Sequence, residues 1–164
     1  VAGGQGHLQG RVAVVAVDPE IGDIEILDYV IVEDGGKLIN PMVVDGQIYG
    51  GLAQGIGTAL YEEMNFDASG QPLASTFADY LLPGPTEVPA PKLGHMETLA
   101  PYTEFGVKGI GEGGAIAPPG AIGNAVNDAL KSLGVELLHS PMTPRRVMEG
   151  IEAAKRNRES QIPA

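Results

Sequence analysis

The chain has 164 residues, with 10 Lys and Arg against 21 Asp and Glu and a net charge of −11. A surface this acidic repels phosphodiester backbones, so we expect no nucleic-acid partner. The sequence contains no cysteine, which excludes disulfides, zinc thiolate sites and iron–sulfur ligation by this chain. No apolar run approaches the length of a membrane span, so no membrane association is expected either.

The first ten residues, VAGGQGHLQG, form a loose glycine-rich stretch that begins with Val1. We expect residues 1–10 to be disordered or to be an artificial leader, and the start at Val1 indicates a processed terminus, such a leader or a cut inside a longer chain. Residues 11–18 (RVAVVAVD) and 24–33 (IEILDYVIVE) are rich in β-branched side chains, and PEIGD between them is a hairpin signal. Small and apolar residues alternate through the first run without a polar face, which predicts that both of its faces are at least partly buried.

Residues 45–64 are predicted to form a helix, because apolar residues recur there at helical spacing. Four glycines interrupt this helix, and each costs about 1 kcal/mol relative to alanine, so they indicate close approach to its backbone. The apolar stripe consists of Ile48, Leu52, Ile56, Ala59 and Leu60, and the glycines are Gly50, Gly51, Gly55 and Gly57.

The second half of the chain predicts a short strand at residues 78–82 and an irregular, proline-rich surface segment at 83–101. A helix should begin at Pro118-Pro119 and end near Gly134, followed by a short strand at 135–139. A last helix, capped by Thr143, should extend to about Arg156. We therefore expect a two-layer α+β unit with a mixed sheet and two or three packed helices over residues 11–156, and a C-terminal tail at 157–164.

The sequence GIGEGG at residues 109–114 is the sharpest candidate for chemistry. Glu112 stands between glycines, so no neighbouring side chain shields its carboxylate from a substrate, and such a group can act as a general base. The alternative is a glycine turn with a solvated acid at its tip. The same residues match a dinucleotide-binding fingerprint, but the charge of Glu112 and the missing amides of Pro118 and Pro119 oppose a pyrophosphate there.

Gln54 is the second candidate, because it lies on the helical face opposite the apolar stripe, with Gly50 and Gly57 one turn to either side. A face made of a carboxamide and bare glycines suits a flat polar ligand, although contact between two helices through small residues would use the same pattern. His7, His95 and His139 lie far apart in the sequence, so we predict no metal site made by this chain alone.

Taken in order, several blocks resemble the C-terminal part of the large subunit of molybdenum hydroxylases, the family of xanthine dehydrogenase, aldehyde oxidase and the carbon monoxide dehydrogenase-like enzymes. The blocks are VAVVAVDPEIGDIEILDYVIVEDGGKLINP, GQIYGGLAQGIGTALYEE, ADYLLPGPTEVP and FGVKGIGEGGAIAPPGAIGNAVNDAL. They fall within about residues 11–133, and the ordered combination is far more specific than any one block. The fold implied is part of a larger molybdenum cofactor-binding domain.

The resemblance implies a role for each candidate residue. Glu112 would be the base beside molybdenum during hydroxylation with water as oxygen source, and Gln54 would face the pterin. Gly111, Gly113 and Gly114 would let the loop approach the cofactor. The cofactor would be molybdopterin, in its cytosine dinucleotide form, completed by other segments and absent from the isolated chain.

The resemblance also implies the surroundings of the chain. The partners would be the rest of the molybdenum subunit, an iron–sulfur subunit and an FAD subunit, together with a small-molecule substrate. The enzyme would be cytoplasmic, or else periplasmic. The isolated chain should be inactive and should self-associate through surface that the rest of the subunit would cover. The alternative function is a non-catalytic assembly module that keeps only the fold.

Overall fold

A β-hairpin begins the described part of the chain, which in this computed structural model comprises residues 9–160. Strand β1 (Gln9–Val17) pairs antiparallel with β2 (Ile24–Asp34). Gly22 in the connecting turn has a φ of 76°, the left-handed conformation that glycine adopts most readily. Strand β1 begins two residues before the predicted start, inside the expected N-terminal leader, whose residues 1–8 lie outside the described part.

A third strand completes the sheet. Strand β3 (Lys92–Met96) pairs parallel with β2, giving a mixed sheet in the order β1-β2-β3. This strand falls inside the segment 83–101 that was predicted to be irregular. The prediction was wrong there because KLGHM lacks the β-branched residues that mark strands in a sequence, and its pairing with β2 supplies the structure instead.

Only one face of the hairpin is buried. In β1 the burial alternates, and Val12 and Val14 are exposed while Ala13 and Val15 pack against the core. The expectation that both faces of this strand are partly buried was therefore wrong. The inward face of β2 contributes Tyr29 and Ile31, both fully buried.

Helix α1 (Pro41–Ile56) begins at Asn40, whose side chain accepts a hydrogen bond from the amide of Val43 at 3.3 Å. It starts four residues earlier than predicted and continues as a π-helical turn, η1 (Gly57–Tyr61). The predicted apolar stripe is confirmed, since all five of its members are buried in the core: Ile48, Leu52, Ile56, Ala59 and Leu60.

The remaining helices lie in the second half of the chain. A single turn, α2 (Gly113–Ile116), leads into α3 (Pro118–Leu130), which packs against β1, and a 3-10 turn, η3 (Lys131–Leu133), ends at Gly134. Helix α4 (Pro144–Glu159) begins at Thr143, as predicted, and extends beyond Arg156 into the expected tail. Another 3-10 turn, η2 (Glu104–Gly106), precedes the Glu112 loop.

Two predicted strands are absent from the described residues. Residues 78–80 form a turn and a bend, and residues 81–82 and 135–139 run irregularly. In the second segment, Asn127 of α3 satisfies both backbone groups of Leu137, donating to its carbonyl at 2.9 Å and accepting from its amide at 2.7 Å. A side chain therefore replaces the neighbouring strand that this segment would otherwise need.

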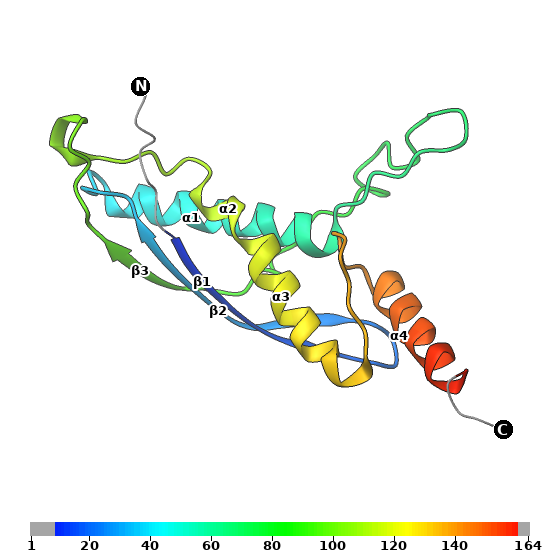
Figure 1. The fold of residues 1–164 in the computed structure, drawn as a ribbon. Helices are drawn as coiled ribbons and strands as arrows, with labels where there is room; N and C mark the ends of the chain where they lie inside the picture. Colours follow the sequence, from blue (N-terminus) through cyan, green and yellow to red (C-terminus); the bar gives the residue numbers. More distant parts are fainter. Residues whose placement is uncertain (1–8, 161–164) are drawn as a thin grey trace.

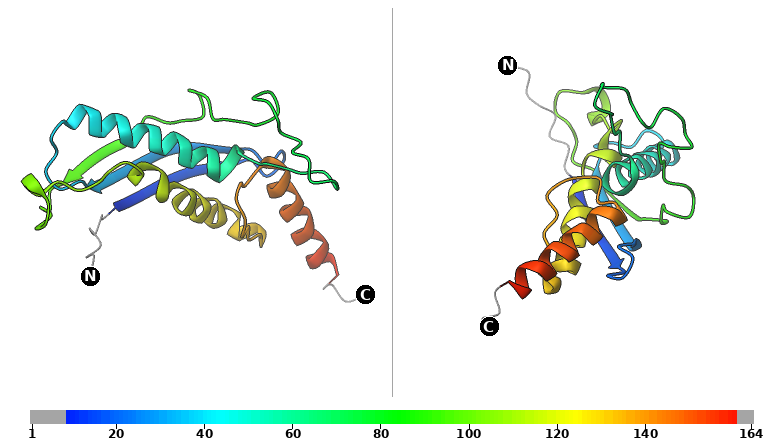
Figure 2. Two further views of the ribbon diagram at one scale, coloured as in Figure 1. Left: turned by 90° about the horizontal axis from the view of Figure 1, so that it is seen from above. Right: turned by 90° about the vertical axis from the view of Figure 1, so that its right-hand side faces the viewer.

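The α+β class, with a mixed sheet and packed helices, is confirmed. Strand β3 and helix α4 lie at opposite ends of the molecule (Figure 1). The left view of Figure 2 shows the same separation from above. The first part of the long connection 62–91 extends away from the helices, and the connection carries exposed apolar side chains, namely Met64, Phe66, Leu73, Phe77, Leu81 and Leu82.

Candidate functional site

An open cavity of about 340 Å³ lies between helix α1 and the loop that precedes α2. The helix supplies one wall, and the loop with the first turn of α2 supplies the other. Its lining includes both residues that the sequence singled out, Gln54 and Glu112. The two residues are separated by more than fifty positions in the sequence, so their meeting at one cavity is a result of the fold.

Glu112 lies directly before α2, outside the helix, and its side chain is exposed. Among residues 9–160, neither an ion pair nor a side-chain hydrogen bond engages its carboxylate. The preceding segment contains no strand, and α2 is a single turn followed by Pro118. A dinucleotide-binding motif requires a strand before the glycines and a helix after them, so this loop does not have that architecture.

Glycines form much of the α1 wall of the cavity around Gln54. A Cβ added to Gly46 or Gly50 would meet no other atom within 4 Å, and the same holds for Gly111 on the opposite wall. These three positions line the cavity, so a ligand can approach the backbone there without meeting a side chain. Gln54 is exposed on the same wall and offers an amide donor and a carbonyl acceptor. Gly57, predicted for this face, is buried instead.

The two walls touch behind the cavity. A Cβ on Gly114 would lie 2.6 Å from the carbonyl oxygen of Ile48, and one on Gly55 would lie 2.7 Å from Pro118. Both glycines are therefore required by the close crossing of α1 with α2 and α3. Gly113 and Gly114 are buried and do not line the cavity, whereas Gly111 does.

Side chains from elsewhere hold the Glu112 loop. Gln47 of α1 donates to the carbonyl of Gly111 at 2.6 Å. Upstream, the buried carboxylate of Asp34 accepts from the Lys108 ammonium at 2.9 Å and from the amides of Gly36 and Thr98, each at 3.0 Å. Burial alone would raise the pKa of Asp34, but these hydrogen bonds outweigh it and hold the pKa below its ordinary value.

Arg11 also anchors the Glu112 loop, and the sequence analysis did not identify it. Arg11 of β1 and Glu33 of β2 form a buried ion pair on the inward face of the sheet, and Arg11 also donates to the carbonyl of Gly113 at 2.9 Å. The signal was present in the sequence, because each charge occupies an inward position of an alternating strand. Charges at such positions are rare unless they are paired.

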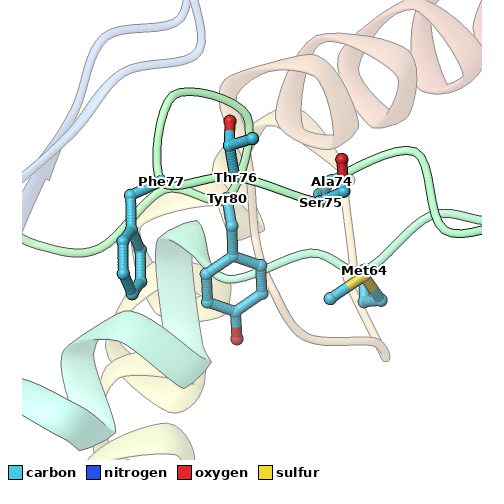
Figure 3. Close-up of a pocket in the computed structure, with 6 residues that line it drawn as sticks. All are labelled: Met64, Ala74, Ser75, Thr76, Phe77 and Tyr80. Atoms are coloured by element: carbon cyan, nitrogen blue, oxygen red, sulfur yellow. The ribbon is translucent and has the colours of Figure 1, made fainter.

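A second cavity, of about 290 Å³, lies in the connection 62–91 and is walled mainly by apolar atoms (Figure 3). Asp, Glu, His, Lys and Arg side chains are all absent from its lining, whose one titratable group is the phenol of Tyr80. Its lining is Met64, Ala74, Ser75, Thr76, Phe77 and Tyr80. Within residues 9–160, His, Asp and Glu side chains nowhere gather in threes that could hold a metal ion, and none of the helices is long and apolar enough to cross a membrane.

A family model described as the molybdopterin cofactor-binding domain matches residues 8–89, half of the chain. The chain belongs to this family. The matched residues of this molybdopterin-domain chain include both strands of the hairpin and all of α1, with Gln54. They end before the Glu112 loop.

Individual relatives extend the match over most of the chain. The nicotine 6-hydroxylase large subunit of Paenarthrobacter nicotinovorans is 42% identical over 85% of this chain. The carbon monoxide dehydrogenase large chain of Hydrogenophaga pseudoflava is 35% identical over 85% of it. The crystal structure of quinoline 2-oxidoreductase from Pseudomonas putida 86 superposes with a TM-score of 0.85 at 42% identity, over 88% of this chain and 18% of that one. The chain spans 17% of the length of both curated relatives.

Proposed function

We propose that this chain is a segment of a molybdenum hydroxylase large subunit, where it supplies the base Glu112 and part of the molybdopterin site. The reaction would be oxidative hydroxylation of an aldehyde or an N-heterocycle, with water as the oxygen source. The observation that carries the proposal is the shared cavity, in which Glu112 and Gln54 stand on facing walls beside bare glycines. A module that only maintained the fold would gain nothing from an exposed, unpaired acid at this place.

The residues of the cavity fit a flat polar cofactor. Gly46, Gly50 and Gly111 leave open space where side chains would project, so a ring system can lie against the backbone. Gln54 can donate and accept hydrogen bonds at the edge of such a ring. Gly113 and Gly114 contribute from behind, by letting the loop lie close to α1. Other segments of the subunit complete the site.

Glu112 would accept a proton at its carboxylate. When bound, the molybdenum centre supplies the redox chemistry and the oxygen transfer, while the protein positions the substrate and moves protons. A carboxylate bracketed by glycines can approach the reacting centre without a steric barrier. The loop anchors at Gly111 and Gly113 hold it in one position, which is what general-base catalysis requires.

Substrate, cofactor form and partners follow from the relatives by analogy. Nicotine and quinoline, named for two of the similar enzymes, are N-heterocycles, which supports that substrate class. We infer a cytosine dinucleotide form of molybdopterin, iron–sulfur and FAD subunits as partners, and a cytoplasmic location.

The isolated chain is expected to self-associate, because Val12, Val14 and Leu27 of the hairpin are exposed.

The cofactor role of this cavity is tested by the substitution Gln54→Leu in the assembled enzyme. Loss of one hydrogen bond of about 1 kcal/mol corresponds to about fivefold weaker retention of the cofactor. We expect the molybdenum content after dialysis to fall on that scale, whereas Gln71→Leu, at an exposed glutamine away from the cavity, should retain it. Equal retention in the two variants would contradict the proposal.

A further inference from the structure

Arg11 connects the sheet to the Glu112 loop through a single nitrogen atom. Its Nη2 lies within hydrogen-bond distance of the carboxylate of Glu33, of the carbonyl of Gly113 at 2.9 Å and of the side chain of Gln9 at 3.1 Å, so its two hydrogens are shared among three acceptors. The side chains of Arg11 and Glu33 are 2% and 1% exposed. Arg11 thus holds, from the side of the sheet, the peptide group between Gly113 and Gly114.

Stability does not account for this cluster. Within residues 9–160, four buried side-chain polar atoms have no hydrogen-bond partner. Three belong to this pair, namely Nε and Nη1 of Arg11 and Oε2 of Glu33, and the fourth is the hydroxyl of Tyr29, which lies on the same face of β2 as Glu33. Buried polar groups without partners cost free energy. A buried ion pair is often no more stabilising than apolar residues of the same volume, so an apolar cluster would serve the fold at least as well.

The contacts around Glu112 indicate another purpose. The residues on either side of Glu112 are glycines, Gly111 in the loop and Gly113 at the start of α2, and glycine restricts its backbone less than any other residue. Their carbonyls are nevertheless both held by side chains, that of Gly111 by Gln47 and that of Gly113 by Arg11. Gln47 holds the loop from the solvent side, and Arg11 holds it from the interior.

We propose that Arg11 is a positioning residue, which fixes the Glu112 carboxylate in the cavity by holding the carbonyl of Gly113. Glu33 orients Arg11 for this contact. The inference rests on the function proposed for Glu112, and it assigns the buried pair a role that burial alone does not explain. Displacement of a reacting group by about 1 Å can cost a rate factor on the order of 100, so the clamp would matter for turnover.

The test variant removes both charges at once. Arg11→Met with Glu33→Gln leaves no unpaired charge in the interior and approximately conserves volume, so the fold should persist. The matched control is Arg146→Met with Glu63→Gln. Arg146 also pairs with a glutamate, at 2.5 Å, and donates to a backbone carbonyl, that of Pro141 at 3.0 Å, but it does not contact the loop.

Two measurements are made on the assembled enzyme. Amide hydrogen exchange of residues 109–116, measured without cofactor, should be about tenfold faster in the Arg11 variant and unchanged in the control. With cofactor, kcat per bound molybdenum should fall between about tenfold and 100-fold, while KM stays within about twofold. Both changes are required, so wild-type exchange or wild-type kcat in the Arg11 variant would overturn the proposal.

Two further variants keep the outcomes separate. If the double variant does not fold, Arg11→Lys takes its place, because lysine keeps the buried charge but is one bond shorter. Wild-type exchange in that variant would also overturn the proposal. Glu112→Gln is measured in parallel: wild-type turnover there would contradict the function of Glu112, while the exchange data would still report whether Arg11 holds the loop.

Discussion

Gly51 of α1 and Gly114 of α2 touch through their backbones. A Cβ added to Gly51 would lie 2.6 Å from the Cα of Gly114, which is closer than carbon atoms can approach without displacement. This contact sets the spacing between the helix that carries Gln54 and the turn that follows Glu112. The width of the cavity therefore depends on this pair of glycines, of which only Gly51 lines the cavity.

Gly51→Ala should push α1 away from α2. The added methyl group meets backbone atoms that cannot rotate away, and overpacking of this kind costs about 2 kcal/mol. We expect a lower melting temperature and reduced turnover. Gly50→Ala is the matched control, because a Cβ there meets nothing within 4 Å and alanine favours the helix. A melting temperature for Gly51→Ala equal to or above that of Gly50→Ala would show that the helices do not cross this closely.

Gly50→Leu should separate folding from cofactor binding. The leucine side chain would project into the cavity beside Gln54, where it would occupy space that we assign to the pterin. The melting temperature of the cofactor-free protein should stay near that of the wild type, and the bound molybdenum should fall severalfold. The control is Gly120→Leu, at another position with open space around it on α3. Full molybdenum content in Gly50→Leu would place the cofactor elsewhere.

The buried pair of Asp34 and Lys108 should make stability depend on pH. Hydrogen bonds hold the pKa of Asp34 below its ordinary value of 3.8. Its contribution is therefore fully present well above that value and is lost as the pH falls from there toward the lower folded-state pKa. At neutral pH, Asp34→Asn should cost on the order of 3 kcal/mol, since it leaves the Lys108 ammonium buried without its partner.

Chemical denaturation of the wild type and of Asp34→Asn across the acid range measures this dependence. The difference in the free energy of unfolding should shrink as the pH falls below 3.8. Asp28→Asn is the control, because Asp28 also pairs with a lysine, Lys92, but at the surface, where such pairs contribute little. If the difference in the free energy of unfolding between the wild type and Asp34→Asn did not change with pH, the charge of Asp34 would not be what stabilises the pair.

Local patterns in the sequence predicted much of this fold. The hairpin, the apolar stripe of α1 and the capping residue Thr143 all depend on neighbours within a few positions, which a sequence displays directly. Strand β3 was missed because its pairing with β2 depends on residues about sixty positions away. The strand expected at 135–139 was wrong because Asn127 satisfies the backbone there.

The residues of the candidate site were likewise predicted only in part. Gln54 and Glu112 were identified from their glycine surroundings and from the family resemblance, and the structure brings them to one cavity. The anchors Arg11 and Asp34 were not identified. The inward position of Arg11 in β1 could have marked it as paired, but the loop partners of the two anchors, Gly113 and Lys108, lie 102 and 74 residues away. Contacts over such separations exist only once the sheet and the loop have come together.

The most direct measurement is turnover per bound molybdenum in the assembled enzyme with Glu112→Gln. Glutamine keeps the shape of the side chain but cannot accept the proton, so we predict a loss of at least about 100-fold with molybdenum content near that of the wild type. The control is Glu104→Gln, which should turn over normally. Glu104 is an exposed acid that lies, like Glu112, between β3 and α2, but it does not line the cavity. Wild-type turnover in Glu112→Gln would show that Glu112 is not the base.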